Sequence, residues 1–348
     1  MAITLSSLRQ FDSLGFDTII DVRSPAEWAE DHMPGAISLP VLDNEERARV
    51  GTIYKQESPF KARKVGGALV ARNAAAHLEG PLAAMDGGWM PLVYCWRGGM
   101  RSGSFATILK SVGWRADVVE GGYKTWRRLV VTQVYDLPVP SPLVVLDGNT
   151  GSAKTAVLAE LAALGMQVID LEGLARHRGS LFGAVEGGQP SQKAFEGALA
   201  LALARLDPAR PVVVEAESSK VGNCRLPPRL WRAMVAAPRI EIAAPRPERA
   251  AYLTRAYADL LADPARLAAV VGLLRPLHPA ERIAEWQAMA WAGAFATLAD
   301  SLMAHHYDPR YAKHRARMEV PVTRIETQDL STTGVAALAR EIAGQLRG

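Results

Sequence analysis

Twice in this chain, a short apolar run leads into a glycine-containing loop and then into a helical pattern. The first run covers residues 92–95, with its helix at 104–111, and the second covers residues 143–147, with its helix at 155–164. A buried strand, a loop and a helix form the repeating unit of parallel α/β proteins. We therefore predict a parallel α/β sheet in each half of the chain. The other predicted strands are residues 18–22, 167–170, 212–215, 240–243 and 322–325, and a last helix covers about residues 334–346.

Three prolines at alternate positions, Pro138, Pro140 and Pro142, separate the two halves. They favour an extended linker over residues 138–142 and exclude helix. We predict a first domain over residues 1–137 and a second over residues 143–348, which agrees with two domains for a chain of 348 residues. The second includes a helical region at about residues 249–317. Its expected breaks are Pro264, Pro276, Pro279 and Pro309.

Composition limits the classes of protein and the compartment. No apolar run reaches the roughly 18 residues of a membrane span, and the N-terminus does not resemble a secretory signal. Two cysteines cannot form a disulfide framework, so we expect a cytoplasmic protein without a membrane partner. The net charge of +4 permits nucleic acid as a partner. Only nine of the 40 basic residues are lysines, and arginine suits phosphate contacts and base stacking.

The first loop, residues 95–101, reads Cys-Trp-Arg-Gly-Gly-Met-Arg. Gly98 and Gly99 let the backbone turn so that its N–H groups, together with the following helix N-terminus, surround Cys95. Arg97 and Arg101 also favour the thiolate, which is the reactive form. We predict a nucleophilic cysteine that takes an atom or group from an anionic donor. The alternative is a buried, inert cysteine at a strand end.

The second loop, residues 148–155, reads Gly-Asn-Thr-Gly-Ser-Ala-Lys-Thr and has the context of a phosphate-binding loop. Lys154 would neutralise a diphosphate, and Thr155 would hold a metal, for which Mg²⁺ is one candidate. Ala153 replaces the usual glycine, so its methyl group crowds the loop if that residue needs positive φ. The alternative is an ordinary strand–turn–helix. The candidate phosphate-binding residues are Gly148, Thr150, Gly151, Ser152, Lys154 and Thr155.

Other polar residues are weaker candidates. Either Glu215 or Glu217, after the strand at 212–214, would serve a metal or a base, or would simply cap the strand end. The cluster Arg176, His177, Arg178 and Lys193 suits phosphates, although such clusters are commonly solvated faces. Two basic segments are candidate RNA surfaces: a loop over residues 51–72 containing Lys61, Arg63 and Lys64, and the tract 305–317 containing Arg310 and Lys313. For each, a solvated surface is the alternative.

Residues 21–28 and 32–40 closely resemble the rhodanese signature, and residues 120–126 resemble its closing motif. The resemblance implies structural roles for Asp21 and Arg23 and makes Cys95 the carrier of a chalcogen. Common sulfur-transferring rhodaneses have six residues in the active loop, whereas this loop has seven, as in dual-specificity phosphatases. A wider loop suits a larger atom or a phosphate-bearing donor.

The order of motifs over nearly the whole chain resembles the tRNA 2-selenouridine synthases. The resemblance rests on the rhodanese and phosphate loops together with residues 170–196, 217–227 and 306–311. It implies a transferase acting on wobble 2-thiouridine in the tRNA anticodon loop. Geranyl diphosphate would first give an S-geranyl intermediate, and selenophosphate would then supply selenium. Both are co-substrates, and no tightly bound cofactor is implied.

In that scheme, Cys95 carries or delivers selenium, while Arg97 and Arg101 hold the phosphate of the donor. The prenyl chain needs an apolar groove, for which the helical residues 286–295 are a candidate, although their aromatics also suit plain core. Two other functions remain open at this stage. One is a rhodanese sulfurtransferase fused to an ATP-dependent small-molecule kinase. The other is a non-enzymatic chalcogen carrier or RNA-binding adaptor.

Overall fold

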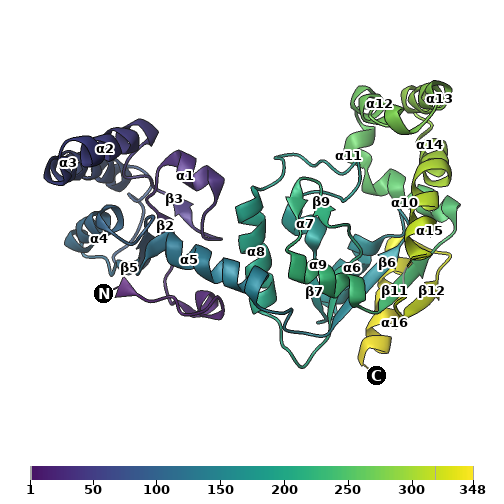
Figure 1. Cartoon of the computed structure of the whole chain (residues 1–348), viewed down its shortest axis with the longest axis horizontal. Helices are drawn as coiled ribbons and strands as arrows, with labels where there is room; N and C mark the ends of the chain where they lie inside the picture. Colours follow the sequence, from purple (N-terminus) through teal and green to yellow (C-terminus); the bar gives the residue numbers. More distant parts are fainter. Residues whose placement is uncertain (1, 318, 348) are drawn as a thin grey trace. The chain divides into compact units, whose positions relative to one another are not determined.

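Each half of the chain builds one five-stranded sheet in which all strand pairs are parallel, which confirms the predicted fold class. The computed structural model describes residues 2–317 and 319–347. It divides into two units (Figure 1): Met1–Pro138 with Pro190–Arg205, and Val139–Gln189 with Leu206–Gly348. The predicted division placed residues 190–205 in the second domain, whereas their contacts place them in the first unit.

The first sheet has the strand order β1-β5-β4-β2-β3. Its strands are β1 (Ala2–Ile3), β2 (Thr18–Asp21), β3 (Ile37–Ser38), β4 (Pro91–Tyr94) and β5 (Asp117–Val119). The helices of this unit are α1 (Pro25–Glu30), α2 (Asn44–Gln56), α3 (Pro59–Glu79), α4 (Met100–Val112), α5 (Gly122–Val131) and α8 (Gln192–Ala204). Because β4 is central, the loop that follows it lies at the carboxyl edge of the sheet, where α/β proteins bind ligands.

The second sheet has the order β12-β11-β6-β8-β7, again with the loop-bearing strand in the centre. Its strands are β6 (Leu143–Gly148), β7 (Gln167–Ile169), β8 (Val212–Glu215), β11 (Arg239–Ala243) and β12 (Val322–Glu326), and β9 (Lys220–Val221) pairs separately with β10 (Cys224–Arg225). The helices are α6 (Lys154–Ala163), α7 (Leu171–Ala175), α9 (Pro228–Ala236), α10 (Arg246–Ala256), α11 (Ala258–Leu261), α12 (Pro264–Gly272), α13 (Ala280–Trp291), α14 (Phe295–Leu302), α15 (Asp308–Arg315) and α16 (Thr332–Arg347).

The helix α8 packs against α5 in the first unit, although the sequence around it belongs to the second half of the chain. Arg127 of α5 forms an ion pair with Glu196 of α8. Tyr135 also donates a hydrogen bond to Glu196, at 2.6 Å. The buried carboxylate of Glu196 is therefore satisfied entirely from within the first unit.

The expectation of a basic loop over residues 51–72 is wrong, because these residues lie in α2 and α3. Asp43 caps α2 by accepting the N–H of Glu46 at 2.7 Å, and the Glu46 side chain reciprocates, forming a capping box. Ser58 caps α3, with proline at its first position. Gly66 lies inside α3, where a Cβ atom would stand 3.4 Å from Val50 of α2. These local signals outweigh the roughly 1 kcal/mol that each helical glycine costs.

The helical region 249–317 is present, but Pro309 does not break it. Pro309 lies in the first turn of α15, which continues from the π-helical residues Met303–Tyr307. Because the helix is continuous here, Pro309 removes one backbone donor, and the wider π-helical turn that precedes it accommodates the lost bond. Within the described residues, no helix is long and apolar enough to span a membrane.

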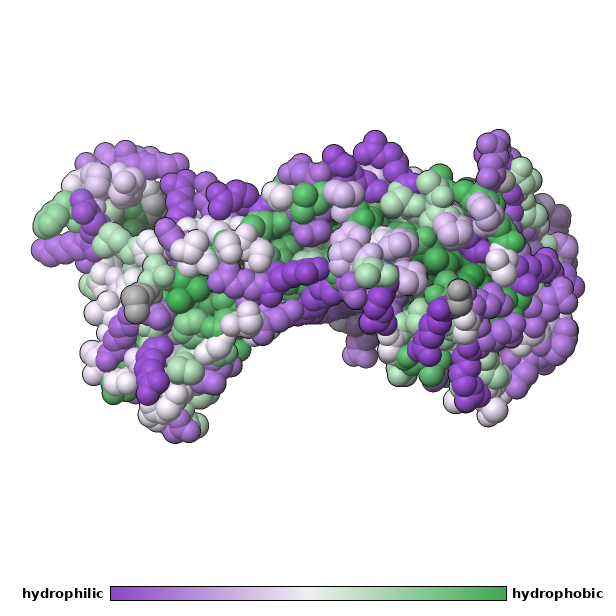
Figure 2. All heavy atoms as spheres, turned by 90° about the horizontal axis from the view of Figure 1, so that it is seen from below, coloured by the Kyte–Doolittle hydropathy of each residue, from purple (hydrophilic) through white to green (hydrophobic). Residues whose placement is uncertain are grey.

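Helices cover both sheets, so that the apolar strand residues form separate cores in the two units. A third apolar cluster joins α12, α13 and α14. On the face drawn in Figure 2, hydrophilic side chains cover much of the surface, and patches of hydrophobic side chains are exposed among them. The cores therefore hold the carboxyl ends of β4 and β6 in place, and with them the two loops.

Candidate functional site

The cysteine loop follows β4 and is supported from below by the closing motif at residues 120–126. The backbone N–H of Tyr123 donates to the carbonyl of Cys95 at 2.8 Å. Gly98 has φ +65°, and a Cβ atom there would lie 2.5 Å from the carbonyl oxygen of Val119. Gly122 is equally confined, since its Cβ would lie 2.2 Å from the Cys95 carbonyl oxygen. Both glycines are therefore required for the loop to close on this motif.

Cys95 is buried, and its thiol has the electrostatics of a nucleophile. Burial alone opposes the thiolate, but a hydrogen bond from Ser102 Oγ at 3.2 Å, backbone N–H groups and the charge of Arg101 together lower the pKa of Cys95. Cys224 provides the comparison, since burial raises the pKa of its thiol. A lowered thiol pKa is typical of reactive cysteines, and a raised one is typical of inert core cysteines.

The two arginines of this loop differ in their partners. Arg101 donates to Glu27 at 2.7 Å, and Glu27 also pairs with Arg47 at 3.3 Å. Although burial acts in the opposite direction, these contacts lower the pKa of Glu27 to about 2. Arg97 is exposed and forms no ion pair within residues 2–317 and 319–347. Arg97 is therefore the more available cation for an incoming anion, and Arg101 is partly neutralised by Glu27.

Asp21 and Arg23 form a buried ion pair of 2.7 Å beside this loop. The Arg23 guanidinium also lies 4.0 Å from the ring centre of Tyr123. These contacts tie β2 to the closing motif, as a structural role requires.

The phosphate loop follows β6 and leads into α6. Gly148 and Gly151 have φ of +154° and +84°, and Ala153 has φ +60°. Left-handed backbone at a residue with a Cβ atom costs about 1–2 kcal/mol, so the loop holds Ala153 in a strained conformation. The buried hydroxyl of Ser152 has no hydrogen-bond partner within the described residues, as a group that awaits a ligand oxygen would.

Lys154 and Thr155 stand where the loop becomes a helix. Lys154 Nζ donates to the Gly148 carbonyl at 3.0 Å. Burial acts against its charge, but nearby groups including Glu172 and Glu217 keep the pKa of Lys154 above its ordinary value. Lys154 is therefore a cation, as phosphate binding requires.

The segment 306–311, singled out in the sequence, packs on this loop. Asp308 accepts a hydrogen bond from Asn149 at 3.1 Å and pairs with Arg249 at 2.7 Å. Arg249 in turn donates to the carbonyl of Thr150 at 3.0 Å. These contacts fix the loop from the side opposite β6.

A pair of carboxyl groups lies beside Thr155. Thr155 Oγ1 donates to Glu172 at 3.0 Å, and oxygens of Glu172 and Glu217 lie 2.8 and 2.4 Å from the Cβ position of Gly179. Burial and the adjacent Glu172 raise the pKa of Glu217 to about 8, so the pair carries one shared proton near neutral pH. Glu215 instead accepts the N–H of Glu172 at 2.7 Å and is fully buried, as a structural group would be. Sequence reasoning named Glu217 but missed Glu172.

A cavity of about 890 Å³ opens over the phosphate loop and includes both carboxyl groups of this pair. Of the predicted cationic cluster, only Arg178 lines it, and Arg178 also pairs with Asp259 at 3.0 Å. Arg176 and His177 do not line the cavity, and burial lowers the pKa of His177, which favours its neutral form. Arg310, predicted for RNA, lines the cavity instead. The cavity residues that sequence reasoning missed include Arg239, Tyr252 and Tyr257, whereas Tyr307, Tyr311 and Arg315 lie in the tract 305–317 that it had predicted to contact RNA.

A second, narrower cavity of about 70 Å³ is almost entirely apolar. It shares Thr150, Ser180, Leu253, Tyr257 and Tyr307 with the larger one, so the two cavities are adjacent. Phe295 lines it, whereas Trp286 is buried in the helical core and donates to Ser301 at 2.9 Å. The expected apolar groove is thus formed mainly by α10, α11 and α14.

The remaining predicted RNA residues are exposed. Lys61, Arg63 and Lys64 lie on α3, and Lys313 lies on α15. Within the described part of the chain, no group of three or more histidine, cysteine, aspartate or glutamate residues is arranged to hold a metal ion.

Comparison with known proteins matches a different family model to each half of the chain. A model of the tRNA 2-selenouridine synthase AAA domain matches residues 141–270, and a model of the rhodanese-like domain matches residues 5–129. The tRNA 2-selenouridine synthase of Alcanivorax borkumensis is 40% identical over 230 residues, which are 64% of this chain and 62% of that protein. That of Aeromonas salmonicida is 39% identical over 69% of this chain and 64% of its own length. That of Psychromonas ingrahamii is 34% identical over 72% and 67%. The matched part spans somewhat under two thirds of the first two relatives.

Proposed function

Since this chain belongs to the tRNA 2-selenouridine synthase family, we propose that it is a transferase that replaces sulfur by selenium at wobble 2-thiouridine of tRNA. The observation that carries the proposal is the pair of anion sites. One holds a thiol of lowered pKa, and the other is a phosphate loop with an apolar cavity beside it. A kinase for a small polar substrate would have no need of the apolar cavity.

The first step is alkylation by geranyl diphosphate at the second loop. The diphosphate would lie against the loop N–H groups and Lys154, and the prenyl chain would extend into the apolar cavity. The sulfur of 2-thiouridine attacks the first carbon of the geranyl group, the carbon–oxygen bond breaks, diphosphate leaves and the base loses its N3 proton. Lys154 stabilises the negative charge that develops on the diphosphate.

A magnesium ion fits this step. The hydroxyl of Thr155 and the carboxylates of Glu172 and Glu217 are oxygen ligands of the kind that Mg²⁺ prefers, and the ion would neutralise the leaving diphosphate.

The second step brings in selenium at the cysteine loop. A thiocarbonyl sulfur is a poor leaving group until it is alkylated, which explains why alkylation comes first. Selenium then bonds to C2 of the base, geranylthiol leaves with one proton, and N3 of the base takes up another. Arg97 and the loop N–H groups would hold the donor phosphate while the thiolate of Cys95 attacks phosphorus, so that the phosphorus–selenium bond breaks and selenium is delivered as selenide. Water then takes the phosphoryl group from the sulfur as phosphate.

Mass spectrometry of nucleosides tests the proposal. Transfer RNA containing 2-thiouridine is incubated with the full chain and geranyl diphosphate, without and then with selenophosphate. We expect S-geranyl-2-thiouridine in the first case and 2-selenouridine in the second. If neither product forms while ATP is bound and hydrolysed, the kinase fusion is correct. If tRNA binds without any conversion, the chain is an adaptor.

A further inference from the structure

The helix pair α2–α3, here called the basic hairpin, concentrates positive charge in a short part of the chain. The two helices and their turn, residues 44–79, contain seven lysines and arginines and four glutamates, which gives a net charge of +3 out of the +4 of the whole chain. All seven cations lie within residues 47–72, where Glu57 is the only acidic residue. All seven cations are exposed, and five of them form no ion pair within the described residues: Arg49, Lys55, Arg63, Lys64 and Arg72. This concentration of charge favours a polyanionic partner.

Two aromatic rings stand at the turn of the basic hairpin. Tyr54 is 59% exposed, and Phe60, at 72%, is the most exposed large hydrophobic residue of the described chain. They flank the turn between the two helices. Neither ring stacks on another aromatic side chain in the part of the chain that the structure describes. Rings of this size are ordinarily buried, so two of them near one another in sequence and open to solvent indicate a contact surface.

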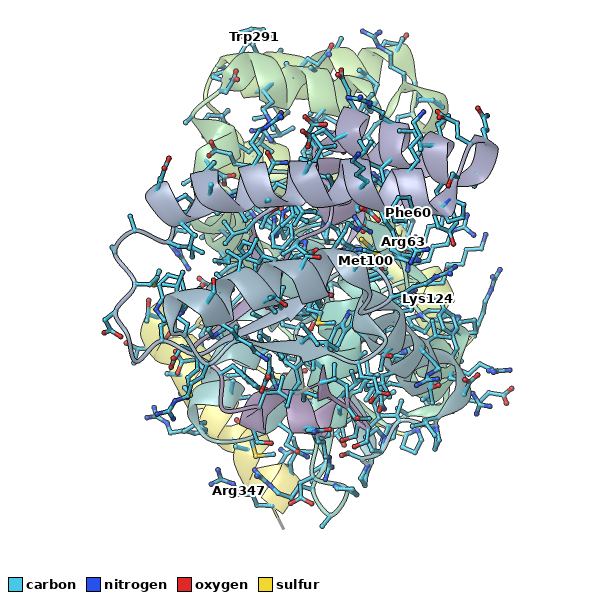
Figure 3. All side chains as sticks on the ribbon, turned by 90° about the vertical axis from the view of Figure 1, so that its left-hand side faces the viewer. Phe60, Arg63, Met100, Lys124, Trp291 and Arg347 are labelled. Atoms are coloured by element: carbon cyan, nitrogen blue, oxygen red, sulfur yellow. The ribbon has the colours of Figure 1, made fainter. Side chains whose placement is uncertain are left out.

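The basic hairpin is joined to the cysteine loop by specific contacts. Arg47 of α2 pairs with Glu27, which also holds Arg101 of the loop. The α3 helix packs on α4, whose first residue, Met100, is 58% exposed. Figure 3 shows Phe60, Arg63, Met100 and Lys124 along the same side of the first unit. Phe60 and Arg63 of the basic hairpin therefore lie on the same side of the unit as Met100, the first residue of the helix that follows the cysteine loop.

We propose that the basic hairpin binds an unpaired RNA loop, with bases stacked on Tyr54 and Phe60 and phosphates held by the flanking cations. This inference rests on the proposed function, because the RNA is the tRNA whose wobble base must reach the chemistry. Flat rings interleaved with cations suit single-stranded nucleic acid, since each base offers a face for stacking. A duplex would bind the cations but leave both rings unused. Binding here would present an extruded base next to Cys95.

Binding of a labelled anticodon stem–loop containing 2-thiouridine to the full-length chain tests the proposal, measured by fluorescence anisotropy. We expect the double variant Tyr54→Ala/Phe60→Ala to bind about 100-fold more weakly, or about tenfold for each ring. Trp291→Ala is the matched control, because that ring is 63% exposed but lies on α13 in the second unit. It should leave binding unchanged. Equal thermal melting of all variants would show that they fold.

Two further measurements separate the outcomes. Lys55→Ala/Lys64→Ala should reduce the salt dependence of binding by about 0.7 in log–log slope for each RNA phosphate that is no longer neutralised. A fully paired hairpin of the same length should bind at least tenfold more weakly than the open loop. If the double aromatic variant binds like the wild type, or the paired hairpin binds equally well, this inference is wrong even where the wild type makes selenouridine. If the wild type binds no tRNA, the proposed function itself fails.

Discussion

The cysteine loop and the phosphate loop are built on the same plan but place different side chains at the centre. Each follows a central parallel strand, turns through residues with positive φ and leads into a helix N-terminus. In the first, the centre is a buried thiol of lowered pKa. In the second, it is the ammonium group of Lys154, kept charged by neighbouring carboxylates.

The difference shows how one backbone arrangement supports two chemistries. N–H groups at a helix N-terminus attract an anion in either case. In the proposed function, the thiolate placed there acts as a nucleophile, whereas the ammonium group stabilises the charge of a leaving diphosphate. The predictions below change one loop at a time, so that each tests whether the two loops have separate tasks.

The largest effect is expected for Cys95→Ala. Loss of the thiolate should lower selenium incorporation about 1,000-fold or more, because no other group of the loop can replace it. Geranylation should stay within about twofold of wild type, since the phosphate loop is untouched. Nucleoside mass spectrometry reports both products from one reaction. Intact selenium incorporation would remove Cys95 from the mechanism.

Lys154→Ala should lower geranylation about 100-fold, because the charge on the leaving diphosphate loses its main cation. Lys154→Arg serves as the conservative variant and should recover part of this rate. The rate is measured as S-geranyl-2-thiouridine formed with excess geranyl diphosphate. An unchanged rate would mean that the diphosphate binds elsewhere.

Gly98→Ala should destabilise the first unit by about 3 kcal/mol. The new methyl group adds left-handed strain and meets the Val119 carbonyl oxygen at 2.5 Å, and that oxygen is held in the sheet. Urea unfolding gives the free energy directly. Gly99→Ala is the matched control, because a Cβ atom there meets nothing within 4 Å. Similar losses for both variants would contradict the role of the closing motif.

Glu217→Gln should change how stability depends on pH. The pKa of Glu217 is raised to about 8 in the folded chain, so the folded state keeps a proton that the unfolded state releases above about pH 4.5. Stability of the wild type therefore falls as pH rises from about 4.5 to 8. The glutamine variant lacks this fall, and its melting temperature should exceed that of wild type at pH 9 but not at pH 5. If the melting temperatures of wild type and variant changed with pH in parallel, the carboxyl pair would share no proton.

The smallest effect is expected for Ala153→Gly. Glycine relieves the left-handed strain at φ +60° but adds freedom to the unfolded chain, so the two terms nearly cancel. The free energy of unfolding should change by less than about 1 kcal/mol. Ala162→Gly, exposed within α6, should instead lose about 1 kcal/mol. Equal losses at both sites would mean that Ala153 is unstrained.

Sequence alone predicted both sheets, because each strand–loop–helix unit is a local pattern. The sequence also indicated crowding at Ala153, because that prediction depended only on the φ of this one residue. It did not predict that α8 packs with the first unit, because the pairing of Arg127 with Glu196 joins distant parts of the chain. Nor did it pair Glu172 with Glu217. These residues follow different strands, β7 and β8, and only the pairing of those strands brings their side chains together. The helices α2 and α3 were missed for a different reason, because Gly66 and Gly67 were taken as loop signals.

The most direct test of separate tasks supplies tRNA that already carries S-geranyl-2-thiouridine, together with selenophosphate, to the Lys154→Ala variant. The measured quantity is the rate of 2-selenouridine formation relative to wild type. If the two loops have separate tasks, the variant should form 2-selenouridine at a rate within about twofold of wild type, because the cysteine loop is intact and alkylation is no longer needed. A loss as large as that expected for geranylation would contradict the account, because it would make the phosphate loop part of the selenium step as well.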